Sequence, residues 1–146
     1  MDTKKFLIGT LAGGVVYFFL GYLVYGLLLQ GFYEANAGSA TGVMRSDDEM
    51  VWWALVLGNL AFAALLTYIF LKWAHISTFK SGLRGGAAIG FFMAFSFNLI
   101  MYATTNIMNL TSAVVDIIVA TIMTAIIGGV IGAVLHAKPH EEVAAA

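Results

Sequence analysis

Residues 84–116 read RGGAAIG FFMAFSFNLI MYATTNIMNLTSAVVD. The stretch opens with small residues, which let helices approach each other closely, and it passes through an aromatic segment into a short polar connection. It ends at Asp116, just inside another apolar run. A carboxylate inside an apolar run costs insertion energy. We therefore expect Asp116 to face a partner within the protein and not lipid.

The composition around this stretch is that of a membrane protein. Of 146 residues, 61% are hydrophobic and 10% are charged, against about 25% charged in soluble domains. Four apolar runs are each long enough to cross a bilayer, which takes about 20 residues. We predict an all-α membrane protein, a four-helix transmembrane bundle of two hairpins forming a single domain. The predicted helices span 6–29, 51–73, 83–105 and 113–136, with an outer loop at 30–50 and a tail at 137–146.

Basic residues predict the orientation, because cytoplasmic segments carry an excess of Lys and Arg. The first connection has one basic residue, Arg45, among four acidic ones, and the third has no charge. Both termini and the second connection are therefore predicted to be cytoplasmic. The residues that carry this prediction are Lys4, Lys5, Lys72, Lys80, Arg84 and Lys138.

Several classes of function are disfavoured by what the sequence lacks. It has no cysteine, and we find no nucleophile–base pair, metal-ligand set or cofactor motif. We predict a protein that is not an enzyme and binds no metal or cofactor. The formal net charge of -1 gives no indication of a nucleic-acid partner. His75, His136 and His140 fall near helix ends, where exposed histidines are the simpler interpretation.

Small residues gather in the cytoplasmic halves of the first, third and fourth predicted helices, and aromatic and polar residues gather in the outer halves. Because glycines allow close helix contact, the pattern predicts a bundle that is tight inside and wider outside, with a cup open to the outer side. The glycines predicted to pack are Gly9, Gly13, Gly86, Gly90, Gly128 and Gly132. The 30–50 loop, with Phe32 and Tyr33, is either a solvated loop or a lid that folds back over the cup.

Polar and aromatic residues lie at two matching depths below the outer boundary. Asn98 and Tyr102, four residues apart, are predicted to share a helix face that Asp116 can reach. Two interpretations stay open: a closed hydrogen-bond network that fixes helix register, or a site for a ligand or proton. Trp52 fits an interfacial anchor as well as a ligand contact. The candidate ligand-binding residues are Asp116, Tyr102, Asn98, Asn59, Tyr22, Tyr25 and Trp52.

Helices 3 and 4 carry a Tyr-Ala-Thr stretch at 102–104, an Asn-Leu pair at 109–110 and an Asp-Ile pair at 116–117. With these motifs the chain resembles bacterial four-helix integral membrane protein families of unknown function. It departs from their pattern at 105–106 and at 119–120. The resemblance implies a location in the bacterial inner membrane and implies no activity.

Three functions compete at this point. The first is a non-enzymatic membrane protein that binds a small or lipid-like ligand in its outer half. The second is a membrane-complex subunit or homo-oligomer that packs through its glycine faces. The third is a small proton-coupled transporter. An open polar pocket favours the first function, and a filled core with flat glycine faces favours the second. The expected partners are the lipid bilayer, a lipid or small amphiphile, and further copies of the chain.

Overall fold

The computed structural model describes residues 2–136, which form an all-helical protein. Four segments are long and apolar enough to cross a membrane, as predicted. They are α1 (Thr3–Gly21) continued by η1 (Tyr22–Leu28), α3 (Trp52–Ile69) continued by η3 (Phe70–Ala74), α4 (Phe79–Thr104) and α5 (Leu110–His136). Between η1 and α3 lie a short helix α2 (Gln30–Ala35) and a 3-10 turn η2 (Asp47–Glu49). The predicted tail at 137–146 lies outside the described residues.

Three of the long helices begin earlier than hydropathy predicts, at residues 3, 79 and 110 instead of 6, 83 and 113. Polar capping residues cause the difference. The Asp2 carboxylate accepts from the backbone N–H of Lys5 at 3.2 Å, and Thr78 forms a capping box at the start of α4. Asn109 Oδ1 accepts from the backbone N–H of Ser112 at 2.8 Å. Caps satisfy backbone donors that a helix start leaves free, so each helix extends into polar sequence.

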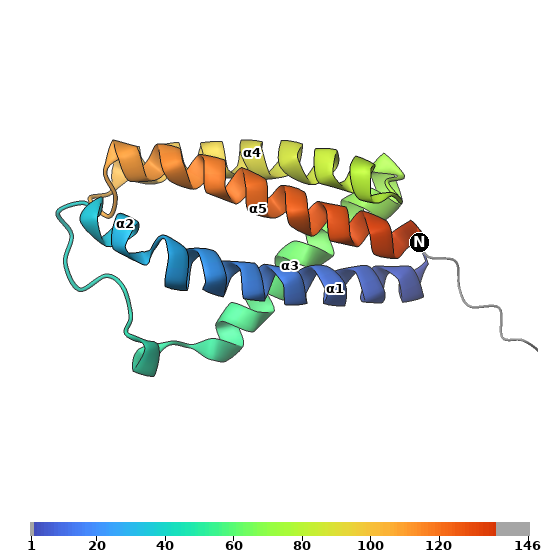
Figure 1. The fold of residues 1–146 in the computed structure, drawn as a ribbon, viewed down its shortest axis with the longest axis horizontal. Coiled ribbons are helices and arrows are strands. Elements are labelled where there is room, and N and C mark those ends of the chain that lie inside the picture. The colour runs from blue at the N-terminus through green and yellow to red at the C-terminus, as the bar shows by residue number, and fades with distance from the viewer. Residues whose placement is uncertain (1, 137–146) are drawn as a thin grey trace, which may run out of the picture.

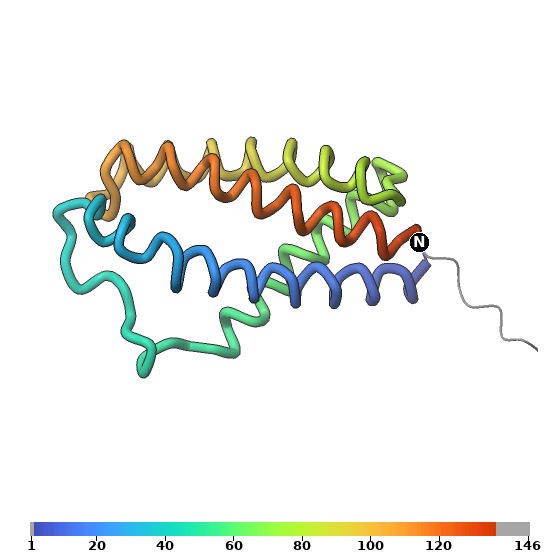
Figure 2. The backbone as a smooth tube through the Cα atoms, in the orientation of Figure 1, coloured from blue at the N-terminus to red at the C-terminus, as the bar shows by residue number. Residues whose placement is uncertain are grey.

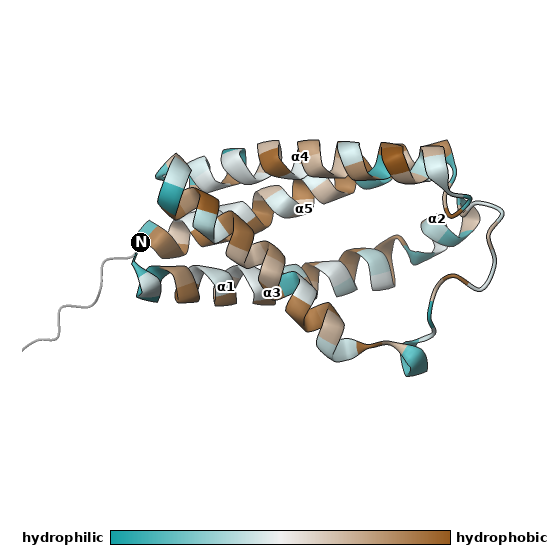
Figure 3. Ribbon diagram, turned by 180° about the vertical axis from the view of Figure 1, so that it is seen from behind, coloured by the Kyte–Doolittle hydropathy of each residue, from teal (hydrophilic) through white to brown (hydrophobic). Residues whose placement is uncertain are grey.

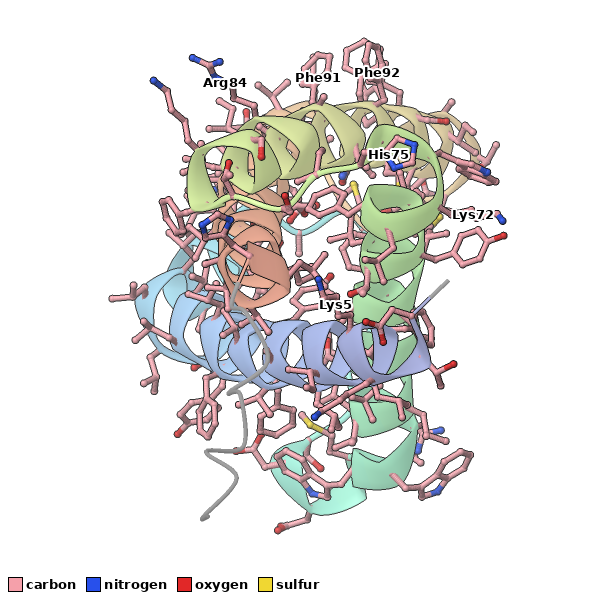
Figure 4. The ribbon with its side chains drawn as sticks, turned by 90° about the vertical axis from the view of Figure 1, so that its right-hand side faces the viewer. Lys5, Lys72, His75, Arg84, Phe91 and Phe92 are labelled. Atoms are coloured by element: carbon pink, nitrogen blue, oxygen red, sulfur yellow. The ribbon has the colours of Figure 1, made fainter. Side chains whose placement is uncertain are left out.

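The bundle has two distinct ends. One, here the α2 end, holds α2 and the connection 105–109; the other, here the basic end, holds the start of α1 and the η3–α4 connection (Figure 1). Figure 4 views the basic end, where Lys5, Lys72 and Arg84 are labelled. In Figure 3 the strongly hydrophilic ribbon lies mostly near these two ends and on η2, apart from one position within α3.

The closest helix contact joins α4 and α5, which run side by side (Figures 1 and 2). A Cβ added at Gly86 would meet the backbone carbonyl of Thr124, and one added at Gly128 would meet that of Gly82. Only glycine lets two backbones approach this closely. The pairing of α4 and α5 therefore depends on glycines, which have only a hydrogen atom in place of a side chain.

The apolar core lies toward the basic end. Five large side chains from α3, η3 and α5 are fully buried there: Leu66, Phe70, Ile127, Ile131 and Leu135. Helix α1 packs on both α3 and α5. A Cβ at Gly9 would meet Thr67, and one at Gly13 would meet Ile131 at 2.7 Å. Small residues on α1 thus let it lie directly against this core.

Helix α3 behaves differently along its length. It crosses α1 obliquely, and its first turns lie away from the α4–α5 pair (Figures 1 and 2). Every residue from Trp52 to Gly58 is exposed, whereas Ala63, Leu66 and Thr67 are buried. A Cβ at Gly58 would meet no atom within 4 Å. The half of α3 nearer the α2 end therefore has little support from the rest of the chain.

Candidate functional site

The carboxylate of Asp116 accepts three hydrogen bonds from other parts of the chain. The hydroxyls of Tyr25 and Tyr33 donate to Oδ1 at 2.8 Å and 3.0 Å, and the Asn98 amide donates to Oδ2 at 2.8 Å. We call these four residues the carboxylate clasp. They come from η1, α2, α4 and α5, so one carboxylate joins four separate elements.

The packing of α4 on α5 fixes the Asn98 part of the clasp. Asn98 is only 2% exposed, and its Nδ2 also donates to the Ala94 carbonyl at 3.0 Å. Both amide hydrogens are therefore used. Turning the amide over would place its oxygen against the Ala94 oxygen, so the contacts determine which atom faces Asp116.

Tyr33 is the clasp residue that sequence reasoning did not include among its candidates. It lies in α2, and its ring packs on that of Tyr25 with centroids 5.5 Å apart. The only signal was the pair of aromatic residues in a loop expected to be solvated or to fold back. Burial and the nearby Asp116 charge raise the pKa of Tyr33 above its ordinary value. A raised pKa keeps the hydroxyl protonated at neutral pH, so it remains a donor.

The first and third connections are joined beside the clasp. The backbone N–H of Gly38 donates to the Ile107 carbonyl at 2.9 Å, and that of Ala40 donates to the Asn106 carbonyl at 3.0 Å. Asn109 bonds Asn36 through its backbone N–H and its amide. A Cβ at Gly38 would meet the Asn106 carbonyl. Residues 30–40, here the strap, are thus fastened to the α4–α5 connection.

Asn59 lies in a different place from the clasp. It lines a groove of about 290 Å³ between α1 and α3, together with Leu11, Gly14, Val15, Phe18, Phe19, Val56 and Leu60. Asn59 is the only polar side chain in this lining. Among residues 2–136 its amide has no hydrogen-bond partner. The structure therefore separates Asn59 from the other predicted polar residues because α3 diverges from the α4–α5 pair.

The remaining predicted site residues do not join the clasp. Tyr102 is 43% exposed and Tyr22 is 58% exposed; within the described chain neither hydroxyl makes a hydrogen bond. Trp52 is exposed at the start of α3. Asn98 and Tyr102 lie about one turn apart on α4, but Asn98 is buried at the contact with α5, whereas Tyr102 is exposed.

The six glycines predicted to pack all lie at contacts between helices of this one chain. Gly9 and Gly13 face α3 and α5, whereas Gly86, Gly90, Gly128 and Gly132 lie in or beside the α4–α5 contact. A glycine face that is covered within the chain is not free for a partner. Between residues 2 and 136 no three side chains of His, Cys, Asp or Glu gather as metal ligands.

Comparisons with known proteins find no relative of this chain. The resemblance of helices 3 and 4 to bacterial four-helix families stays a prediction. No family model, no curated protein and no solved structure matches the chain.

Proposed function

We propose that this chain is a non-enzymatic integral membrane protein that binds a lipid-like amphiphile in the groove between α1 and α3. The observation that carries the proposal is Asn59, the one polar side chain lining an otherwise apolar groove, whose amide has no hydrogen-bond partner among the described residues. A polar amide in a membrane needs a hydrogen-bond partner. A bound molecule supplies one.

The lining sets the chemistry of this ligand. Its body is apolar, because it contacts leucine, valine and phenylalanine side chains. It carries one hydroxyl, ester or amide group, because a carboxamide both donates and accepts. Asn59 is seven residues from the start of α3, or about 10 Å along the helix. The polar group therefore lies below the level at which a lipid headgroup sits.

The clasp supports this location over the cup that the sequence favours. The donors around Asp116 belong to the chain itself, so its oxygens are already bonded. The closed core at the basic end supports binding over proton-coupled transport, which needs a second opening. The glycines covered by α1, α4 and α5 weigh against a scaffold that packs through them.

The proposed topology places the basic end in the cytoplasm. Lys4, Lys5, Lys72, Lys80 and Arg84 lie at that end, and cytoplasmic segments are enriched in such residues. Both termini are then cytoplasmic, and the four spanning helices form two hairpins. The resemblance to bacterial families supports an inner membrane as the location.

Native mass spectrometry after gentle extraction tests the proposal. The parent protein should retain a lipid-like molecule, and Asn59→Leu should lose most of it. Val15→Trp, which fills the groove from α1, should lose it too. Ser96→Ala is the matched control, because Ser96 lines a separate hollow on α4 and should leave retention unchanged.

Two results would overturn the proposal. One is equal retention by the parent, Asn59→Leu and Val15→Trp. The other is a parent that carries no small molecule and is recovered with a second copy or another protein on α3.

A further inference from the structure

We propose that the carboxylate clasp is a proton-operated latch, which holds the strap down while Asp116 is ionised and releases it when Asp116 takes up a proton. This inference is independent of the groove proposed above. It concerns the outer connection, whereas the groove lies between α1 and α3.

The first step is the count of donors and acceptors. All three groups that face the Asp116 oxygens donate hydrogen, two to Oδ1 and one to Oδ2. An ionised carboxylate only accepts, whereas a protonated one must also donate. The clasp therefore matches the ionised form.

The second step is that a proton weakens the clasp. A hydrogen on Oδ2 would face the Asn98 amide, whose orientation is fixed by its bond to Ala94, so the proton belongs on Oδ1, where a tyrosine hydroxyl can turn and accept it. The contacts of Tyr25 and Tyr33 with Oδ1 then become hydrogen bonds between neutral groups. Hydrogen bonds to an ionised carboxylate are about twice as strong as neutral ones, so protonation weakens the tie between Asp116 and the strap.

The third step concerns the charges around Asp116. The titratable groups that bond it are two tyrosines, Tyr25 and Tyr33, which both donate to Oδ1. In the part of the chain that the structure covers, no Lys, Arg or His bonds it. The hydrogen bonds to Asp116 therefore come from neutral groups. Within the described residues, no bonded cation is present whose loss of a proton could release the strap instead.

The last step links Asp116 to the strap. Tyr33 is the side-chain tie between α2 and the transmembrane bundle. The bonds of Gly38, Ala40 and Asn109 continue the same attachment to the α4–α5 connection. Release of Tyr33 therefore frees one end of a row of backbone bonds, and their opening is a measurable event.

Hydrogen exchange of the full-length protein in nanodiscs, followed by mass spectrometry, measures this opening. Protection factors, which correct for intrinsic exchange at each pH, are compared for the amides of Gly38, Ala40 and Asn109 at neutral and at acid pH. In the parent, protection should be several-fold lower at acid pH than at neutral pH, because hydrogen bonds to a neutral carboxyl are weaker than those to a carboxylate. Asp116→Asn should have the low value at every pH.

Three further variants make the test specific. Tyr33→Phe removes one donor and keeps the carboxylate, so it should lower protection at neutral pH even if Asp116→Asn fails to fold. Glu34→Gln replaces an acid that is next to Tyr33 in the sequence and accepts a hydrogen bond from Gln30. This variant should keep the pH response of the parent. Tyr102→Phe removes an exposed hydroxyl and should match the parent.

The latch is excluded if parent protection is the same at neutral and acid pH. It is equally excluded if Asp116→Asn keeps the pH response of the parent, or if Glu34→Gln abolishes that response. None of these results depends on a ligand in the groove, so failure of the latch and failure of the proposed function can be told apart.

Discussion

The basic end and the α2 end of this bundle hold their helices together by different means. At the basic end, buried apolar side chains and close glycine contacts join α1, α3, α4 and α5. At the α2 end, one carboxylate and a few backbone hydrogen bonds join the elements, while the start of α3 is largely unsupported. Packing is distributed over many atoms, whereas the clasp depends on a single carboxylate.

The largest difference should come from adding one methyl group at each of two glycines. At Gly128 the new Cβ would meet the Gly82 backbone carbonyl, which cannot move aside as a side chain can. We expect Gly128→Ala to lower the free energy of unfolding by about 2–3 kcal/mol. At Gly58 nothing lies within 4 Å, so Gly58→Ala should raise it by up to about 1 kcal/mol through helix propensity. Unfolding titrations with SDS in mixed micelles measure both; equal effects would contradict the contrast.

Substitutions of Asn98 and Asn59 should also differ in their effect on stability. Asn98→Ala leaves a part-buried Asp116 oxygen without its donor and should cost about 2 kcal/mol of unfolding free energy. Asn59→Ala removes an amide that has no hydrogen-bond partner among the described residues, and should change stability by less than about 0.5 kcal/mol. The same SDS titrations compare them. A large loss for Asn59→Ala would mean that its amide bonds within the chain.

Helix caps compare the two ends at a smaller scale. Thr78→Ala removes the cap of α4 at the basic end and should cost about 1 kcal/mol. Asn109→Ala removes the cap of α5 and also the contacts of its amide with Asn36, so the loss should be larger by several tenths of a kcal/mol. Thermal unfolding in detergent, with both variants in one series, checks the order; the reverse order would show that the strap adds nothing to α5.

The smallest effects should come from tyrosine hydroxyls. Tyr22→Phe and Tyr102→Phe remove hydroxyls at exposed positions and should change the free energy of unfolding by no more than about 0.5 kcal/mol. Tyr33→Phe removes a donor to Asp116 and should cost about 1 kcal/mol. Parallel thermal unfolding of the three variants decides whether the clasp or the general surface gives the larger loss.

Much of the architecture can be predicted from the sequence, because hydropathy and length identify spanning segments without knowledge of contacts. The four segments agree with the predicted runs to within four residues at each start. The starts differ because Asp2, Thr78 and Asn109 are polar, and polar residues count against a membrane segment even when they cap one. The 109–112 pattern could have been read as a helix start.

The candidate site is harder to predict from the sequence than the spanning segments. That Asp116 needs a partner follows from its place in an apolar run, and its partners Tyr25 and Asn98 were both candidates. Tyr33 lies 83 residues away in the chain, and no local pattern links two residues so far apart. Asn59 was grouped with the others by depth alone, and depth does not reveal that α3 diverges from its neighbours.

The wide turns of η1 have a consequence for how the end of α1 can vary. A π-helical ring closes from residue i to i+5 and so holds one residue more than an α-helical ring. Substituting the exposed Leu23 leaves that count unchanged. Deleting one residue of η1 removes the extra residue, so the segment can close as an ordinary α-helix and the later side chains, Tyr25 among them, can keep their direction. The same deletion in the regular helix α5 would turn every later side chain by roughly 100°. A single deletion should therefore be tolerated better in η1 than in α5.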